Sequence, residues 1–94
     1  MPLLSTVVDV DDERIAVARL RLFGPAREAA GLSSVTLAGG SVSAVIAAAE
    51  EQFGEQFSRV VRVSSIWLNG DAAGPEAPVG DLDEVAVIPP VSGG

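Results

Sequence analysis

The chain has 94 residues, of which 48% are hydrophobic, and six basic residues against 13 acidic ones give it a formal net charge of −7. That length suits one small domain, and the acidic balance argues against nucleic acid as a partner, because phosphate binding needs clustered Lys and Arg. With no Cys and no His, the chain lacks thiol nucleophiles, the commonest metal ligands and the usual general base, so we expect no bound metal or cofactor and no catalysis by the chain alone.

The first 14 residues have a mixed character. Four apolar residues come before four acidic ones: Leu3, Leu4, Val7 and Val8, then Asp9, Asp11, Asp12 and Glu13. We interpret residues 1–14 as a poorly ordered extension and residues 15–94 as a single domain.

Residues 15–23 alternate in polarity, which predicts a half-buried strand with Leu20 and Leu22 inward and Arg19, Arg21 and Phe23 outward. The Gly24-Pro25 pair then starts a short helix that ends at Gly31. A second strand around Val35 and Leu37 follows too closely for a parallel crossover, so we expect the two strands to pair antiparallel.

A longer helix follows the turn at Gly39-Gly40. Ser41 is a candidate N-cap, Gly54 is the candidate end, and apolar residues between them recur at helical spacing: Val42, Val45, Ile46, Ala49 and Phe53. In residues 55–64, the apolar positions Phe57, Val60 and Val61 indicate packing under a loop or a short helical turn.

Two further strands complete the pattern. Residues 65–68 predict a third strand before an Asn69-Gly70 turn, residues 71–78 read as a loop, and residues 84–88 predict the last strand, with Val85 and Val87 inward. The resulting order of elements indicates an α+β domain. We expect a β-grasp arrangement, which is a mixed sheet with the terminal strands central and one face covered by one main helix.

The sequence closes with Pro89-Pro90-Val91-Ser92-Gly93-Gly94. Each proline fixes its own φ and pushes the preceding residue toward extended backbone, so this tail should project from the fold. Glycine has no side chain, so the tail could enter a slot too narrow for one. Such a terminus suits a carboxylate that another protein modifies, and the alternative is a frayed end.

Three stretches resemble one family, the ubiquitin-like sulfur carriers. They are residues 22–31 (Leu-Phe-Gly-Pro-Ala-Arg-Glu-Ala-Ala-Gly), residues 68–70 (Leu-Asn-Gly) and residues 83–94, the last of which looks like the C-terminal signature of the small subunit of molybdopterin synthase. The family usually has glycine one residue before the Asp-Glu pair, where this chain has Leu82. Since leucine is penalised at positive φ, the turn here is expected to differ in type.

The resemblance implies a function at Gly94. In the family, an E1-like adenylyltransferase uses ATP to adenylate the C-terminal carboxylate, which is then converted to a thiocarboxylate. The tail, from Pro89 through Gly93, would enter the large subunit of molybdopterin synthase and donate sulfur to a cyclic pterin precursor of the molybdenum cofactor. The alternatives are a sulfur carrier for thiamine or cysteine synthesis and a ubiquitin-like protein modifier.

The partner interface is expected beside the tail. Phe23 and Ile88 point away from the inward residues of their strands, so they form an apolar patch if the first and last strands are neighbours; the alternative is that the N-terminal extension covers it. Asp81, Asp83 and Glu84 are the acidic residues closest along the chain to the tail and are candidates for attracting a basic partner. No apolar run is long enough to span a bilayer and no signal peptide is visible, which predicts a cytoplasmic protein.

Overall fold

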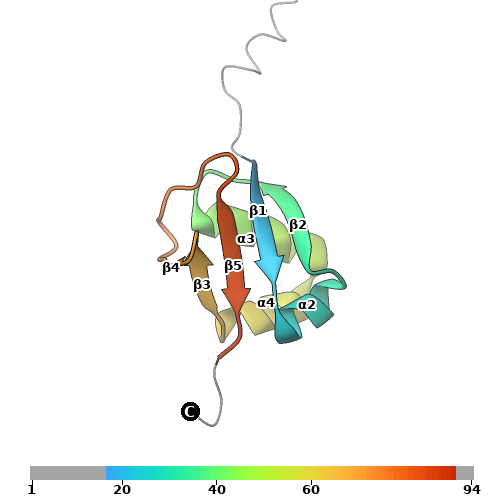
Figure 1. Cartoon of the computed structure of the whole chain (residues 1–94). Coiled ribbons are helices and arrows are strands. Elements are labelled where there is room, and N and C mark those ends of the chain that lie inside the picture. Colours follow the sequence, from blue (N-terminus) through green and yellow to red (C-terminus); the bar gives the residue numbers. More distant parts are fainter. Residues whose placement is uncertain (1–16, 91–94) are drawn as a thin grey trace, which may run out of the picture.

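The computed structural model describes residues 17–90 (Figure 1). The predicted extension, residues 1–14, and the tail residues 91–94 therefore lie outside the described residues.

Within residues 17–90, five strands form one mixed sheet in the order β2-β1-β5-β3-β4. Their bounds are β1 Val17–Leu22, β2 Ser34–Ala38, β3 Ser65–Leu68, β4 Asp71–Ala72 and β5 Glu84–Ile88. The two central strands, β1 and β5, run parallel, and the other neighbours run antiparallel. The β-grasp fold predicted from the order of elements is confirmed, including the central position of the terminal strands.

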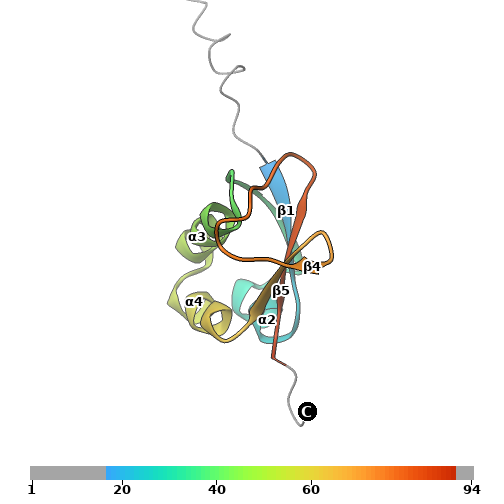
Figure 2. The ribbon, with the colours of Figure 1, turned by 90° about the vertical axis from the view of Figure 1, so that its left-hand side faces the viewer.

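The helices of the described chain lie on one side of this sheet (Figure 2). They are α2 Gly24–Ala30, α3 Val42–Phe53 and α4 Glu55–Arg62. The main helix α3 begins as predicted, because the Ser41 side chain accepts a hydrogen bond from the Ala44 amide. It does not cover the face alone, since α2 and α4 share it.

The core lies between the helices and the sheet. Alternation along β1 buries Ala18, Leu20 and Leu22, and β5 adds Val85 and Val87. The helices contribute Ala26, Val42, Val45, Ile46, Ala49 and Phe57, and Leu37 of β2 and Val79 complete the cluster. The opposite face of the sheet, which we call the outer face, carries the other residue of each alternating pair and has no described helix over it.

Two stretches differ from the sequence pattern. Residues 55–62, where the pattern indicates a loop or short helical turn, form helix α4, whose Phe57 is fully buried and packs at 5.2 Å between ring centroids against Phe53. Residues 71–72, predicted as loop, form strand β4 opposite β3 across Asn69 (φ 52°) and Gly70 (φ 92°). Both central residues of this two-residue turn have positive φ, which suits the twist of a tight hairpin.

Candidate functional site

The tail leaves the fold from the middle of the sheet. Strand β5 ends at Ile88, so Pro89 and Pro90 continue from a central strand whose neighbour β1 places Leu22 opposite Val87. Pro89 is half-buried and Pro90 is exposed.

Gly24, which opens α2, holds the root of the tail. Its φ is +55°, and a Cβ placed on it would lie 3.2 Å from Cγ of Pro89. Any larger residue would therefore be strained in its own backbone and would also push against Pro89. The sequence identifies Gly24 as a helix start, but only the tertiary structure shows that it sets where the chain exits.

The outer face next to this exit is apolar. Phe23 follows β1 in extended backbone and keeps an exposed fraction of 38%, on the opposite side to the buried Leu22. Ile88 lies one step beyond the Leu22–Val87 pair and is half-buried. The predicted patch of Phe23 and Ile88 therefore exists in the described structure as a surface feature; its role in binding stays a prediction.

Trp67 extends the same patch and was not singled out from the sequence. It lies opposite Ala86 in the sheet, beside the Ser65–Ile88 pair, and 37% of it is exposed. The signal was present, because Ile66 and Leu68 are inward and the residue between them must face outward. We call Phe23, Trp67 and Ile88 the tail-side patch.

Arg21 connects this patch to an acidic residue. Its Nη1 lies 2.9 Å from Oε2 of Glu84, and its guanidinium carbon lies 5.6 Å from the centroid of the Phe23 ring. Both side chains of the ion pair are partly exposed, so the pair contributes little to stability. Its effect is to hold a cation over the aromatic ring at the edge of the patch.

The three acidic residues predicted for the interface lie at the far end of β5. Five strand residues, or about 16 Å, separate this end from Pro89. Asp81 accepts a hydrogen bond from the Val17 amide at 2.8 Å, and Asp83 accepts from the Gly80 amide at 2.7 Å and from Nδ2 of Asn69 at 3.1 Å. Thus Glu84 shares the outer face with Arg21, while Asp81 and Asp83 hold the turn before β5.

These contacts perturb the pKa of Asp83. The hydrogen bond from the Gly80 amide, followed by that from Asn69, lowers the pKa of Asp83 below its ordinary value of 3.8, because both donors favour the charged carboxylate. Asn69 also joins this turn to the hairpin, since its side-chain oxygen accepts from the Glu84 amide at 2.9 Å.

Leu82 occupies the turn position that the family usually gives to glycine. Its φ is +72° and 94% of it is exposed. Here the leucine itself adopts the left-handed conformation, at a cost of about 1–2 kcal/mol.

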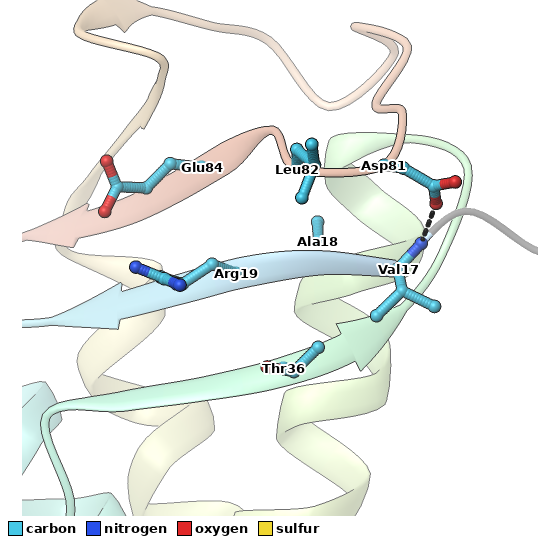
Figure 3. A pocket seen from close by; sticks show the side chains of 7 residues that line it. All are labelled: Val17, Ala18, Arg19, Thr36, Asp81, Leu82 and Glu84. Atoms are coloured by element: carbon cyan, nitrogen blue, oxygen red, sulfur yellow. Dashed lines mark hydrogen bonds between the residues drawn. The ribbon is translucent and has the colours of Figure 1, made fainter.

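A hollow of about 780 Å³ opens beside Leu82 (Figure 3). Its lining comes from the start of β1, the middle of β2, the turn before β5 and the first residue of β5: Val17, Ala18, Arg19, Thr36, Asp81, Leu82 and Glu84. Apolar and charged groups therefore meet where the described chain begins.

Within residues 17–90 no polar or charged residue is buried, and no three potential ligands of the His, Cys, Asp or Glu type cluster. None of the helices in this range has the length and hydropathy to cross a membrane. The predicted tail residues Val91, Ser92, Gly93 and Gly94 lie outside the range, so their roles stay predictions.

Comparison with known proteins gives a family and a set of structural relatives. The model of the ThiS family matches residues 20–94. Among curated proteins, no sequence matches the chain.

Three solved structures illustrate the relatives. Small archaeal modifier protein 1 from Methanosarcina acetivorans is 27% identical with a TM-score of 0.78, over 86% of this chain and 99% of that one. The BexX/CysO complex from Amycolatopsis orientalis is 25% identical with a TM-score of 0.70, and the match covers 82% of this chain and 99% of that one. The complex of subunits 1 and 2 of the molybdopterin-converting factor from Helicobacter pylori is 24% identical with a TM-score of 0.64. That match covers 83% of this chain and 99% of the other.

Proposed function

Because this chain belongs to the ThiS family and has the fold of the ubiquitin-like sulfur carriers, we propose that it carries sulfur as a thiocarboxylate on Gly94 and donates it within molybdopterin synthase. The family match is the observation that carries this proposal, because it extends through the Gly93-Gly94 pair. The described structure supports it, since Pro89 and Pro90 leave the centre of the sheet beside an exposed apolar patch.

The chemistry requires activation by another protein. A carboxylate is a poor acyl electrophile, because its charge repels nucleophiles and oxide is a poor leaving group. Attack of the Gly94 carboxylate on ATP in an E1-like enzyme would release pyrophosphate and form an acyl adenylate. The terminal sulfur of a persulfide on the activating protein would then displace AMP and form an acyl disulfide. A second thiol of that protein would attack the S–S bond, form a disulfide with the first cysteine sulfur and release the Gly94 thiocarboxylate. In this proposal the chain supplies the acyl group. It also supplies the surface by which the activating enzyme and the large synthase subunit bind the chain.

The partner is proposed to be a large synthase subunit that binds the tail-side patch and encloses the tail. Two relatives are complexes with a second protein, subunit 2 of the molybdopterin-converting factor in one and BexX in the other. Aromatic residues in an exposed patch are frequent centres of binding energy. General acid–base chemistry on the pterin precursor would come from the large subunit. We place the reaction in the cytoplasm, with ATP consumed by the activating enzyme.

Intact mass of the protein isolated from its native cells tests the proposal. Replacement of one carboxylate oxygen by sulfur adds about 16 Da. Deleting Gly94 should remove this species and abolish pterin sulfuration with the large subunit, while the melting temperature stays unchanged because the core runs from Ala18 to Val87. Gly93→Val should also block donation, through steric bulk in the tail channel. Full sulfuration by the truncated chain would refute the proposal.

A second candidate is a ubiquitin-like modifier, favoured by the similarity to small archaeal modifier protein 1. Gly94 would then be found in amide bonds to lysine amines of other proteins, since this sequence contains no Lys. A carrier for cysteine or thiamine synthesis would show the thiocarboxylate mass but would co-purify with a different large partner.

A further inference from the structure

Strand β2 forms one edge of the sheet, and every second residue along it turns its backbone groups away from the sheet (Figure 1). Its only neighbour within residues 17–90 is β1. The Leu22 amide donates to the Ser33 carbonyl at 2.9 Å, and bonding alternates along an antiparallel pair, so alternate residues from Ser33 onward bond to β1. The N–H and C=O groups of Ser34, Thr36 and Ala38 therefore point outward, and no strand of the described chain receives them.

This edge lacks the features that usually prevent pairing with another strand. Proteins protect such edges with Lys, Pro, a bulge or a covering element. Residues 31–49 contain no charged residue and no proline, and β2 follows β1 in continuous register without a bulge. The side chains of Ser34, Thr36 and Ala38 are small and exposed. An incoming strand would therefore meet neither bulk nor charge at this edge.

The distribution of charge favours a second copy of the chain as the source of that strand. The chain has a net charge of −7, and every charged residue lies outside residues 31–49, so two copies repel each other least where these edges meet. Arg19 of β1 is the neighbour of Thr36 in the register. In a joined sheet the two Arg19 positions would be three strand spacings apart, about 14 Å, which exceeds the Debye length of about 8 Å at physiological ionic strength.

We propose that two copies of the chain pair antiparallel through β2, with Thr36 opposite Thr36 of the second copy. This register places Ser34 opposite Ala38 and forms about six backbone hydrogen bonds between the outward groups. The contact is isologous, because each copy contributes the same residues around a twofold axis. Two threonines that face each other across antiparallel strands form a favourable pair.

The pairing is expected to be weak and to leave the tail-side patch open. A five-residue edge buries far less than the roughly 1,200 Å² of a stable interface, so we expect a dissociation constant on the order of 100 μM. Trp67 and Ile88 lie on β3 and β5, away from the β2 edge. The joined sheet would present two tail exits at opposite ends, since the two copies run antiparallel.

Sedimentation velocity between about 10 μM and 1 mM tests the pairing. The mean mass of the unmodified chain should rise about 1.5-fold over this range, as expected for a dissociation constant on the order of 100 μM. Thr36→Lys places two cations opposite each other and should keep the mass at that of one chain. The matched control is Gln56→Lys, which makes the same charge change at an exposed residue of α4 and should associate like the unmodified chain.

A second pair of variants removes a single outward N–H group from either edge of the sheet. Thr36→Pro deletes the central donor of the proposed contact and spares the bonds to β1, which is where an edge strand tolerates proline. Ala72→Pro is its control on β4, because the Ala73 amide donates to Ile66 at 3.0 Å and the Ala72 amide therefore points outward. Association should be lost in Thr36→Pro and kept in Ala72→Pro, with melting temperatures confirming that both variants fold.

Amide hydrogen exchange places the contact at single residues. The Thr36 amide should exchange at least about threefold more slowly at 1 mM than at 10 μM, whereas the Ala72 amide should not change.

Three results would overturn the inference. The mass of one chain at all concentrations would show that no pairing occurs. Association that persists in Thr36→Lys would place the contact elsewhere. Exchange at Thr36 that is equally slow at both concentrations would mean that the chain covers its own edge. None of these measurements involves sulfur or another protein, so their outcome is independent of the proposed function.

Discussion

At the scale of single residues, Gly24 joins the fold to the tail. Gly24→Ala should lower the free energy of unfolding by about 1–2 kcal/mol, because alanine is strained at φ +55°. Its Cβ would also sit 3.2 Å from Cγ of Pro89, so the exit of the tail must shift. We expect a clear loss of sulfur donation, measured with the large subunit, beside the drop in melting temperature.

Gly31→Ala is the control for this effect. Gly31 has φ +85°, but nothing lies within 4 Å of its added Cβ. It should show a similar loss of stability with donation retained. Equal donation by the two variants would contradict the role given to Gly24.

Asp83 makes stability depend on pH. The pKa of Asp83 is lowered in the folded chain. Its contribution to the free energy of unfolding is therefore present at pH values above its ordinary pKa of 3.8, and it is lost as pH falls through the lower pKa of the folded chain. Asp83→Asn should therefore reduce stability at pH 7 and flatten the decline of stability at acid pH, measured by urea unfolding between pH 2 and pH 7. A decline that is equally steep in the variant would place the acid sensitivity elsewhere.

At the scale of elements, the central strands β1 and β5 set the partner surface. Their parallel register brings Phe23 beside Ile88, and β3 adds Trp67. Phe23→Ala and Trp67→Ala should each weaken binding to the large subunit by about 1–3 kcal/mol. Stability should change little for either, because both side chains are partly exposed. Isothermal titration would measure the affinities.

Val63→Ala provides the comparison, since Val63 is exposed and ends helix α4 instead of lying on a strand. Its affinity should match that of the unmodified chain. Unchanged affinity for Phe23→Ala together with a large loss of stability would instead make Phe23 a structural residue.

The same scale shows where the sequence was informative. Period-two alternation in residues 17–22 and 84–88 predicts the inward and outward sides correctly, because one face is buried. The pattern in residues 55–64 was ambiguous, since Phe57, Val60 and Val61 fit one helical turn and also a packed loop. The α2 and α3 contacts with α4 favour the helix. Strand β4 escaped prediction because two residues are too few to show periodicity.

At the scale of the whole molecule, the net charge of −7 should steer association with a basic partner. The association rate should fall as salt rises, because the Debye length shrinks from about 10 Å at 0.1 M to about 3 Å at 1 M. Asp81→Asn should lower the rate and flatten its salt dependence, measured by stopped-flow binding. The amide oxygen of Asn can still accept from the Val17 amide, so the turn is kept.

Glu76→Gln is the matched charge change, because Glu76 lies in the segment that contacts the start of α3. It should affect the rate less than Asp81→Asn. A rate that does not vary with salt in the unmodified chain would exclude steering.

The sequence by itself determined the class of fold, the inward faces of the strands, the capped main helix and the family signature at the tail. These are local properties, because periodicity, caps and turn residues act over a few positions. The tertiary structure alone decided that Gly24 contacts Pro89 and that Trp67 joins Phe23 and Ile88. Such relations depend on strand order and register, which bring together residues as far apart in the sequence as Gly24 and Pro89.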